Sequence, residues 1–273
     1  MRKYFIIFIL VIEIILILFL IWVGLTRATH NIEWLNISHR GYSIKVKENT
    51  LAAVKEAFKQ SYNGVEIDVR QTKDGVVVLN HGKNVTGVID GKKKTYTISK
   101  TNYKKLKKLV LMNDEEYGEI HISTLEEVLK YANEKSIELA IHLKVKDKKF
   151  LKKVAKMVVE NNMSGKCLYN GVKDYDSQLK YILSKDKNAR FRISYKYLFE
   201  EENNIFELLY KNQIAVVINA SLLNEEIVNR IKESGSIFYI SGVNNDIFKN
   251  IISFKPDYIE FDDNISINDL KNK

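Results

Sequence analysis

The chain has 273 residues, of which 45% are hydrophobic, and a formal net charge of +9 at pH 7. Its one cysteine, Cys167, excludes an intramolecular disulfide framework, so a packed hydrophobic core must stabilise the fold. The positive charge is suited to anionic lipids or polymers, whereas no basic motif interleaved with aromatic residues predicts a nucleic-acid partner.

The first predicted element is a membrane-spanning helix over residues 5–25. Ile, Leu, Phe or Val occupies 18 of these 21 positions, which outweighs one acidic residue in the middle. Arg2 and Lys3 precede the span and favour an N-terminus inside the cell, with the rest of the chain outside. A cleaved signal peptide is the alternative, but its hydrophobic region is typically about 7–15 residues long. We therefore predict a membrane anchor with a short linker over residues 1–30 and an extracellular domain over residues 31–273.

The next predicted element is a strand over residues 36–39 that ends in His39-Arg40-Gly41. In a barrel of parallel strands, side chains at the carboxyl ends of the strands line the active face. An arginine there is suited to phosphate oxygens, and a glycine permits the tight turn. Glu48 then opens a helix in which apolar residues recur at helical spacing. We interpret Glu48 either as part of the helix cap or as a substrate-binding residue.

A second strand, predicted over residues 64–69, carries two acids. Glu66 and Asp68 alternate with three apolar residues, and a strand sends alternate side chains to opposite faces. In a barrel the apolar face contacts the helices, so both carboxylates point inward and repel each other unless a cation lies between them. A hard divalent cation is the natural ligand for such a pair. An edge strand with solvated acids is the alternative.

Asp74-Gly75 after this strand predicts a two-residue hairpin turn. The chain would then fold back on the strand and place His81 opposite Glu66 or Asp68, depending on the register of the turn. Together with the histidine of the first strand, this residue would face the carboxylate pair. Because imidazoles transfer protons near neutral pH, the pattern predicts an acid–base pair beside a metal site.

Beyond His81, short β-branched runs alternate with amphipathic helical stretches. Thr124, with Glu127 three residues later, forms a capping-box pattern at the start of a helix. The alternation predicts a closed (β/α)8 barrel; an open doubly wound sheet is the alternative, but no glycine-rich phosphate fingerprint follows the first strand. Residues 82–122 are polar and lysine-rich and lack a strong strand pattern, so we expect an insertion over the barrel mouth. Further strands are predicted at residues 76–79, 137–143, 166–170, 190–194, 214–219, 236–241 and 257–261.

The ordered set of these motifs resembles the glycerophosphodiester phosphodiesterase family. The set consists of His39-Arg40-Gly41, Glu48-Asn49-Thr50-Leu51-Ala52, Gly64-Val65-Glu66-Ile67-Asp68-Val69, Thr72-Lys73-Asp74-Gly75 and His81. The resemblance implies a TIM-type barrel and hydrolysis of glycerol phosphodiesters with a divalent cation, Ca²⁺ or Mg²⁺. It also implies three roles: acid–base catalysis by His39 and His81, phosphate binding by Arg40 and Lys144, and metal binding by Glu66 and Asp68.

Three positions depart from the family pattern. Gly82 follows the second histidine where the family has aspartate, so an orienting hydrogen bond is not expected there. His142 occupies the position of a third carboxylate ligand, and an imidazole ligand favours Mn²⁺ or Zn²⁺ over Ca²⁺. Tyr239 replaces a tryptophan, and we expect this substrate-binding position to alter how the alcohol moiety of the substrate stacks.

Two functions follow from these observations. The first is a membrane-anchored, metal-dependent phosphodiesterase that hydrolyses lipid-derived glycerophosphodiesters or a glycerol-phosphate polymer. The second is a degenerate barrel that binds anionic envelope components without hydrolysing them, for which Gly82 and His142 are the motivation. The intact histidine pair favours the enzyme.

Overall fold

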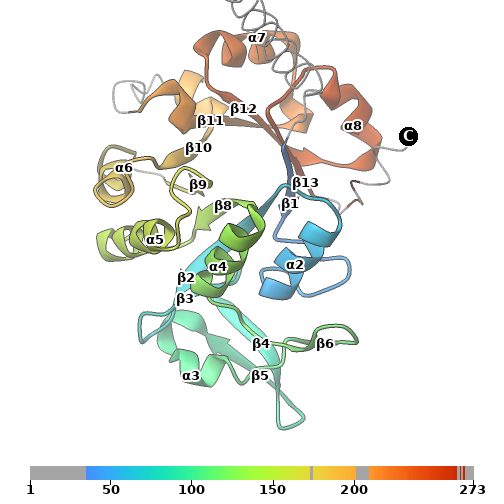
Figure 1. Cartoon of the computed structure of the whole chain (residues 1–273), viewed down its shortest axis with the longest axis vertical. Helices are drawn as coiled ribbons and strands as arrows, with labels where there is room; N and C mark the ends of the chain where they lie inside the picture. Colours follow the sequence, from blue (N-terminus) through green and yellow to red (C-terminus); the bar gives the residue numbers. More distant parts are fainter. Residues whose placement is uncertain (1–34, 173–174, 201–208, 263–264, 266, 268–273) are drawn as a thin grey trace, which may run out of the picture. The chain divides into compact units, whose positions relative to one another are not determined.

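Eight parallel strands form a closed barrel, since the first strand pairs with both the second and the last (Figure 1). This closure confirms the predicted TIM-type barrel and excludes an open doubly wound sheet. The computed structural model describes residues 35–172, 175–200, 209–262, 265 and 267, and the elements below belong to one unit, Leu35–Lys273. In order around the barrel, the strands are β1 (Leu35–His39), β2 (Gly64–Gln71), β8 (Glu138–Leu143), β9 (Cys167–Asn170), β10 (Arg190–Ser194), β11 (Ile214–Asn219), β12 (Ile237–Val243) and β13 (Tyr258–Phe261).

Helices between the strands cover the outside of the barrel (Figure 1). The first begins after Thr50, whose hydroxyl accepts a hydrogen bond from the amide of Ala53. The capping box predicted at Thr124 and Glu127 is confirmed, because each side chain bonds the backbone of the other. These caps satisfy amides that the first helical turn leaves unpaired, so local sequence fixes where the helices begin. The described helices are α2 (Leu51–Lys59), α4 (Leu125–Lys135), α5 (Lys148–Glu160), α6 (Tyr175–Leu183), α7 (Glu225–Ser234) and α8 (Asn245–Ile252), with short turns η2 (Lys196–Glu200), η4 (Lys211–Gln213) and η5 (Ala220–Leu222).

Alternation along β2 sorts its side chains as predicted. The three apolar residues between and beside the acids are fully buried. Glu66 and Asp68 lie on the other face, level with Ala140 and His142 of the neighbouring strand β8. The acids therefore project into the barrel rather than toward the helices.

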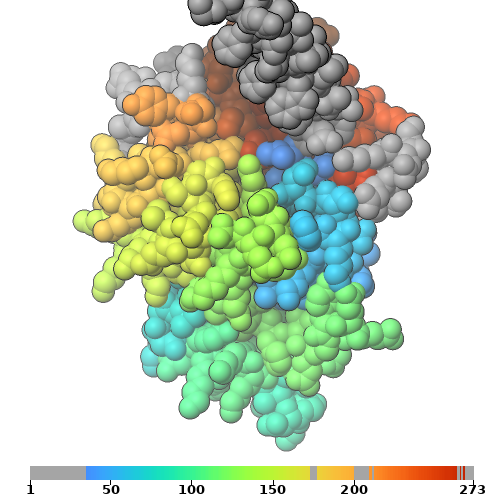
Figure 2. Space-filling model, viewed as in Figure 1, coloured from blue at the N-terminus to red at the C-terminus, as the bar shows by residue number. Residues whose placement is uncertain are grey.

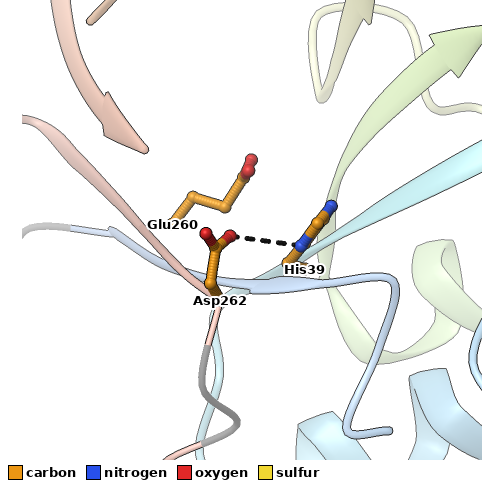
Figure 3. Close-up of side chains that lie close together, drawn as sticks. All are labelled: His39, Glu260 and Asp262. Carbon is orange, nitrogen blue, oxygen red and sulfur yellow. Dashed lines mark ion pairs between the residues drawn. The ribbon is translucent and has the colours of Figure 1, made fainter. Parts of the chain in front are cut away.

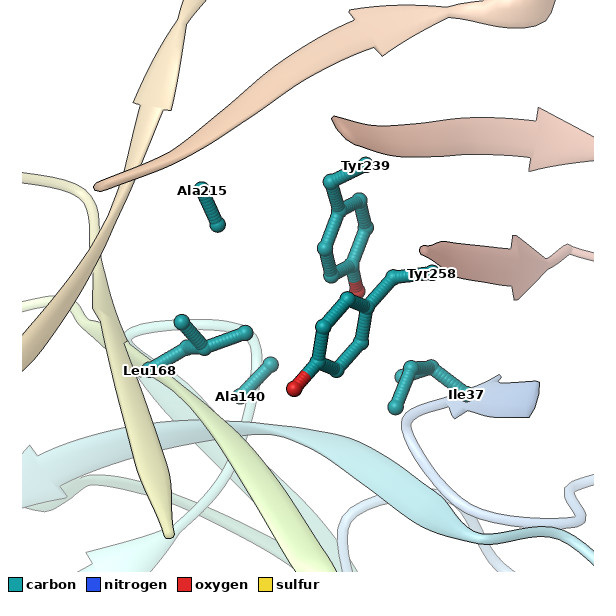
Figure 4. Packing of buried hydrophobic residues seen from close by; sticks show 6 residues of the cluster. All are labelled: Ile37, Ala140, Leu168, Ala215, Tyr239 and Tyr258. Atoms are coloured by element: carbon teal, nitrogen blue, oxygen red, sulfur yellow. The ribbon is translucent and has the colours of Figure 1, made fainter. Parts of the chain in front are cut away.

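An apolar cluster fills the barrel interior toward the amino ends of the strands (Figure 4). Two of its members are tyrosines whose rings stack, with centroids 5.5 Å apart and planes inclined by 9°. Two others are alanines, whose small side chains leave the space that the tyrosine rings need. The cluster consists of Ile37, Ala140, Leu168, Ala215, Tyr239 and Tyr258.

Residues 82–122 contain two β-hairpins, so the prediction of a segment without strong strands is wrong. Asp90 and Gly91 join the first pair of strands, and their φ angles of 50° and 70° are both positive. Such a two-residue turn matches the twist of a hairpin and favours Asp-Gly, a signal that the lysine-rich flank obscured. Including the strand that precedes the segment, the elements here are β3 (Val77–Leu79), β4 (Asn84–Ile89), β5 (Lys92–Thr97), η1 (Ile98–Lys100), α3 (Tyr103–Leu106), β6 (Met112–Asp114) and β7 (Gly118–Ile120).

The same segment has a small hydrophobic core of its own, next to β3. In the view of Figure 2 it forms one end of the visible face, beside α2 and α4. Ile120 also packs against Ala52 and Ala53 of α2. These contacts lie along one side of the barrel, and extension over the mouth stays a prediction. The core consists of Val78, Val85, Ile98, Leu106, Leu109 and Ile122.

The predicted membrane span at residues 5–25 lies outside the described residues. Within the described ranges, none of the helices combines the length and the apolar character needed to cross a bilayer.

Candidate functional site

Neighbouring strands bring ionisable side chains together at the carboxyl end of the barrel interior. His39 ends β1, Glu66 and Asp68 lie on β2, and His142 lies on β8. In the parallel register His39 is level with Glu66, and His142 is level with Asp68. Strand pairing alone therefore gathers four predicted site residues, at the end of the barrel where active sites of this fold lie.

Asp68 is surrounded by hydrogen-bond donors. Lys144 Nζ lies 2.8 Å and His142 Nδ1 3.3 Å from one carboxylate oxygen. Arg40 Nε lies 3.5 Å from the other oxygen. Burial acts to raise the pKa of Asp68, but hydrogen bonds from His142 and Lys144 outweigh it and hold the pKa well below its usual range. Asp68 is therefore an ionised group around which cations converge.

Asn49, a residue that the sequence analysis did not assign to the site, fixes Asp68. Its side-chain amide donates to Asp68 Oδ2 over 2.9 Å, and its side-chain oxygen accepts from the Asp68 amide over 2.7 Å. Asn49 is buried and has a φ of 55°, a left-handed conformation that asparagine tolerates better than most residues. The signal available in the sequence was an asparagine directly before the helix cap, in the motif Glu48-Asn49-Thr50, of which we assigned only Glu48.

Glu66 has fewer partners than Asp68. Its side chain is 3% exposed; Oε1 lies 3.6 Å from His142 Nδ1, and Oε2 lies 3.9 Å from His39 Nε2. Both distances exceed a normal hydrogen bond, and Oε2 has no hydrogen-bond partner among the described residues. Burial raises the pKa of Glu66.

Glu66, Asp68 and His142 fit a divalent cation. One donor atom of each residue lies within 4.8 Å of the donor atoms of the other two. A cation between them would satisfy the buried, unpartnered oxygen of Glu66, and it would offset the negative charge of two neighbouring carboxylates. The donor set is two carboxylates and one imidazole, which also suits Mn²⁺ and Zn²⁺.

A glycine makes room for the imidazole of His142. Gly171 follows β9 with a φ of 79°, and a Cβ there would lie 2.6 Å from His142 Cδ2. Any other residue would therefore push the ring out of position. Burial acts to lower the pKa of His142, but its interactions with the carboxylates of Asp68 and Glu66 raise the pKa overall.

His39 is held from the last strand of the barrel. Its Nδ1 lies 3.2 Å from Asp262 Oδ1, directly after β13 (Figure 3). A carboxylate accepts only, so Nδ1 carries the hydrogen and Nε2 is left on the side of Glu66. The sequence analysis missed Asp262. The available signal was the alternation of Tyr258, Glu260 and Asp262, which repeats the inward pattern of β2.

A second group, His39, Glu260 and Asp262, also meets the distance criterion for a metal (Figure 3). Glu260, however, is already neutralised: Arg192 Nη1 lies 2.6 Å from Oε2, and the Tyr239 hydroxyl donates to the same oxygen over 2.6 Å. Because Arg192 and Tyr239 already occupy Glu260, whereas a buried oxygen of Glu66 has no hydrogen-bond partner among the described residues, the group around Asp68 is the better candidate for a cation.

Tyr239 does not reach the substrate face, and its predicted role in substrate stacking is wrong. Its side chain is fully buried in the barrel core, stacked on Tyr258 and bonded to Glu260. The inward-facing position in the middle of β12 places the ring below the strand ends, where no surface remains for a ligand.

The turn after β2 has three residues rather than the predicted two. Backbone hydrogen bonds close the hairpin around residues 73–75, and Gly75 has a φ of 84°. The additional residue shifts the register by one position, so the Asn80 amide donates to the Asp68 carbonyl. The predicted placement of His81 opposite one of the acids is therefore wrong, because His81 follows the end of strand pairing.

His81 still belongs to the electrostatic environment of the site. The Arg70 guanidinium donates to the His81 carbonyl over 2.6 and 3.1 Å, which fixes this part of the loop. Burial and the positive charge of Arg40 lower the pKa of His81, while Asp68 acts in the opposite direction. A lowered pKa keeps the ring neutral near pH 7.

Arg40 and Glu48 pair at the rim of the site. Arg40 Nη1 lies 3.2 Å from Glu48 Oε2, and Arg40 itself has a φ of 60° immediately after β1. Glu48 thus orients the guanidinium next to Asp68, and it does not cap the helix, because Thr50 fills that role. Arg40 and Lys144 together supply two positive charges that an anionic substrate would meet.

The chain matches the model of the glycerophosphoryl diester phosphodiesterase family over residues 39–198. A glycerophosphodiester phosphodiesterase of Caldanaerobacter subterraneus subsp. tengcongensis is 36% identical over 110 residues, which are 40% of this chain and 45% of the relative. Glycerophosphodiester phosphodiesterase 1 of Rattus norvegicus is 49% identical over 55 residues, or 20% of this chain and 17% of the relative. The matched part thus spans less than half the length of these relatives.

Solved structures share the fold of this chain. A phosphodiesterase from Oleispira antarctica, in complex with the product sn-glycerol-3-phosphate, has a TM-score of 0.70 at 23% identity, covering 87% of this chain and 96% of that chain. A glycerophosphodiester phosphodiesterase from Agrobacterium tumefaciens has a TM-score of 0.69 at 19% identity, covering 86% and 100%. At these identities the likeness is one of fold.

Proposed function

Because the chain belongs to the glycerophosphoryl diester phosphodiesterase family, we propose that it is a metal-dependent hydrolase of glycerophosphodiesters in which His39 and His81 transfer protons. The observation that carries this proposal is the convergence of a candidate ligand set with Arg40, Lys144 and His39 at the carboxyl end of one barrel. His81 lies in the adjoining loop, close enough for the charges of Arg40 and Asp68 to act on its pKa. The glycerol phosphate bound as product by the Oleispira antarctica relative supports the same substrate class.

Two groups of residues would stabilise the charge of the phosphate. Glu66, Asp68 and His142 would hold the divalent cation, whose charge would polarise the phosphoryl oxygens. Arg40 and Lys144, both beside Asp68, would bind the same phosphate and offset the negative charge that develops in the transition state. The side chains of Arg40 and Lys144 already lie at the site, so they would need little reorganisation when the substrate binds.

The two histidines divide the proton transfers. The lowered pKa of His81 keeps it neutral at pH 7, so it is suited to remove a proton from water or from a neighbouring hydroxyl of the substrate. His39 would act as the acid in its doubly protonated form, in which Nδ1 donates to Asp262 and Nε2 carries the proton that passes to the leaving alkoxide. Attack through a substrate hydroxyl would give a cyclic phosphate, and attack by water would give the open monoester.

Hydrolysis of glycerophosphodiesters by the purified full chain in detergent, with Mg²⁺, Ca²⁺, Mn²⁺ or Zn²⁺, tests the proposal. His39→Ala and His81→Ala should each lower kcat by about 10²–10⁴-fold, the usual contribution of a general acid or base. His121→Ala is the matched control, because this histidine bonds the Leu109 carbonyl outside the site. A folded chain that binds metal but hydrolyses none of these esters would instead favour the degenerate, binding-only barrel.

We also propose that residues 5–25 anchor the chain in the cell membrane with the barrel outside. The apolar composition of this stretch and the basic residues before it support the proposal. Protease treatment of intact cells should degrade the barrel domain, and alkaline washing should leave the protein in the membrane fraction. Protection from protease in intact cells, with degradation after lysis, would contradict the orientation.

A further inference from the structure

The turn after β2 and the segment η1–α3 enclose a hollow of about 460 Å³ that is lined by lysines. Figure 1 shows this turn beside α3. Every lysine of the hollow is exposed, and none of them forms an ion pair within the described part of the chain. We call this feature the lysine hollow; it consists of Lys73, Lys100, Lys104, Lys105 and Lys108.

The backbone around the lysine hollow is fixed rather than loosely attached. The Lys73 amide donates to the Thr101 carbonyl over 3.1 Å, and the Tyr103 amide donates to Asp74 Oδ1 over 2.9 Å. Ile98 and Leu106 anchor the same stretch in the small core of the inserted segment. Lysines scattered on a solvated surface would need no such framework.

Asp74 follows Lys73 at the edge of the lysine hollow. It accepts hydrogen bonds from the Thr72 hydroxyl and the Tyr103 amide. Five ammonium groups thus share one concave surface bordered by a single ionised carboxylate, that of Asp74, among the described residues named here, and the excess positive charge attracts anions. Lysines are mobile point charges, so they suit several phosphates at variable spacing better than one planar carboxylate.

The position of the lysine hollow connects it with the site of the barrel. Lys73 follows Asp68 by five residues on the same stretch of chain, which corresponds to about 17 Å at about 3.3 Å per residue. A concave surface fits a flexible chain more readily than it fits the flat surface of a bilayer. We propose that the lysine hollow binds the outlying phosphates of a polyanionic phosphodiester chain while one of its ester bonds lies in the site. This inference rests on the proposed function and narrows its substrate class to a polymer.

Kinetics on two substrates test the inference. The variant Lys73→Gln/Lys104→Gln/Lys108→Gln should raise the KM for a glycerol-phosphate oligomer by about tenfold at low salt, leave its kcat unchanged and leave glycerophosphocholine hydrolysis within about twofold. Its KM for the oligomer should also depend less on salt, with the logarithmic slope reduced by about two for three lost charges. The matched control is Lys92→Gln/Lys93→Gln/Lys94→Gln, which removes the same charge from exposed positions of β5 outside the hollow.

The outcomes separate this inference from the proposed function. Equal effects of the two triple variants on the KM for the oligomer, with monomer hydrolysis intact, would overturn the proposed role of the lysine hollow. The proposed hydrolase function would not be affected by that result. If no ester is hydrolysed, calorimetry can compare how inorganic polyphosphate binds to full-length His39→Ala with and without the three hollow substitutions. Weaker binding with the substitutions would support the lysine hollow as a polyanion site, and equal binding would overturn it. A loss of binding to phosphatidylglycerol vesicles without a loss of polyphosphate binding would mean that the surface serves a bilayer, which also contradicts the proposal.

Discussion

Glu66, Asp68 and His142 lie on neighbouring barrel strands, whereas His81 lies in the loop that follows a hairpin, and these two regions fix their side chains differently. On the strands, parallel pairing sets the level of each residue and alternation sets its face. In the hairpin, one additional turn residue was enough to move the histidine out of the predicted pairing. The strand half of a site is therefore robust to local detail, while the loop half depends on tertiary contacts such as those of Arg70.

The largest loss of activity is expected for a substitution of Asp68 on strand β2. Asp68→Asn should lower kcat/KM by about 10³-fold, because it removes the charge that holds Arg40, Lys144 and His142 in place. Asp262→Asn, on the other side of β1 from Asp68, contacts His39 and should lower kcat/KM by about 10–100-fold. Steady-state kinetics of both variants check this order. Equal losses would mean that the two sides contribute alike.

On the proposed function, metal preference should distinguish this chain from a site with three carboxylates. His142→Glu should raise affinity for Ca²⁺ and Mg²⁺ by about tenfold and lower affinity for Zn²⁺, because a hard oxygen donor replaces a nitrogen donor. Calorimetric titration of each metal into the full chain measures the change. Gly171→Ala, which crowds the imidazole, should weaken Zn²⁺ binding in the parent but less in the glutamate variant. Unchanged metal affinities would show that His142 is not a ligand.

The pH dependence probes the hairpin half. Burial and the Arg40 charge lower the pKa of His81, so the acid limb of kcat/KM should lie below pH 6.5, the ordinary value for histidine. Arg40→Gln removes a positive charge that opposes protonation, so the pKa of His81 should rise and the limb should move to higher pH. NMR titration of the His81 ring, with Lys148→Gln as a distant control, checks the direction. A limb that moves to lower pH in Arg40→Gln would contradict this electrostatic account.

Stability tests the contact between Asn49 and the strand half. Asn49→Gly keeps the positive φ but removes both hydrogen bonds to Asp68, leaving its buried amide unpaired, so the free energy of unfolding should fall by about 1–3 kcal/mol. Asn49→Ala should lose more, since alanine is strained at that φ. Denaturant unfolding of the full chain in detergent measures both. A glycine variant as stable as the parent would show that the hydrogen bonds of Asn49 to Asp68 do not stabilise the fold.

The smallest effect is expected at Tyr239. Tyr239→Phe removes a hydroxyl that donates to Glu260, which keeps its pairing with Arg192, so unfolding should become easier by about 1 kcal/mol. Because the ring lies in the core, KM and kcat for glycerophosphodiesters should stay within about twofold. A marked rise in KM would restore the substrate contact that the buried position contradicts.

The sequence by itself determined the alternation of barrel strands with helices and the inward direction of Glu66 and Asp68, because these follow from short-range periodicity. Strand alternation has a period of two, and the capping box at Thr124 involves residues three apart. Both signals depend only on residues that are close in sequence, so they can be recognised without knowledge of distant contacts.

Only the tertiary structure decided the partners that come from far along the chain. Asp262 reaches His39 because β13 closes the barrel against β1, and Gly171 makes room for His142 because β9 pairs with β8. The same holds for Tyr239, whose depth in the barrel depends on how eight strands are staggered, and for His81, whose register depended on one residue of a turn. Closure and stagger are properties of the whole sheet, and a local pattern does not contain them.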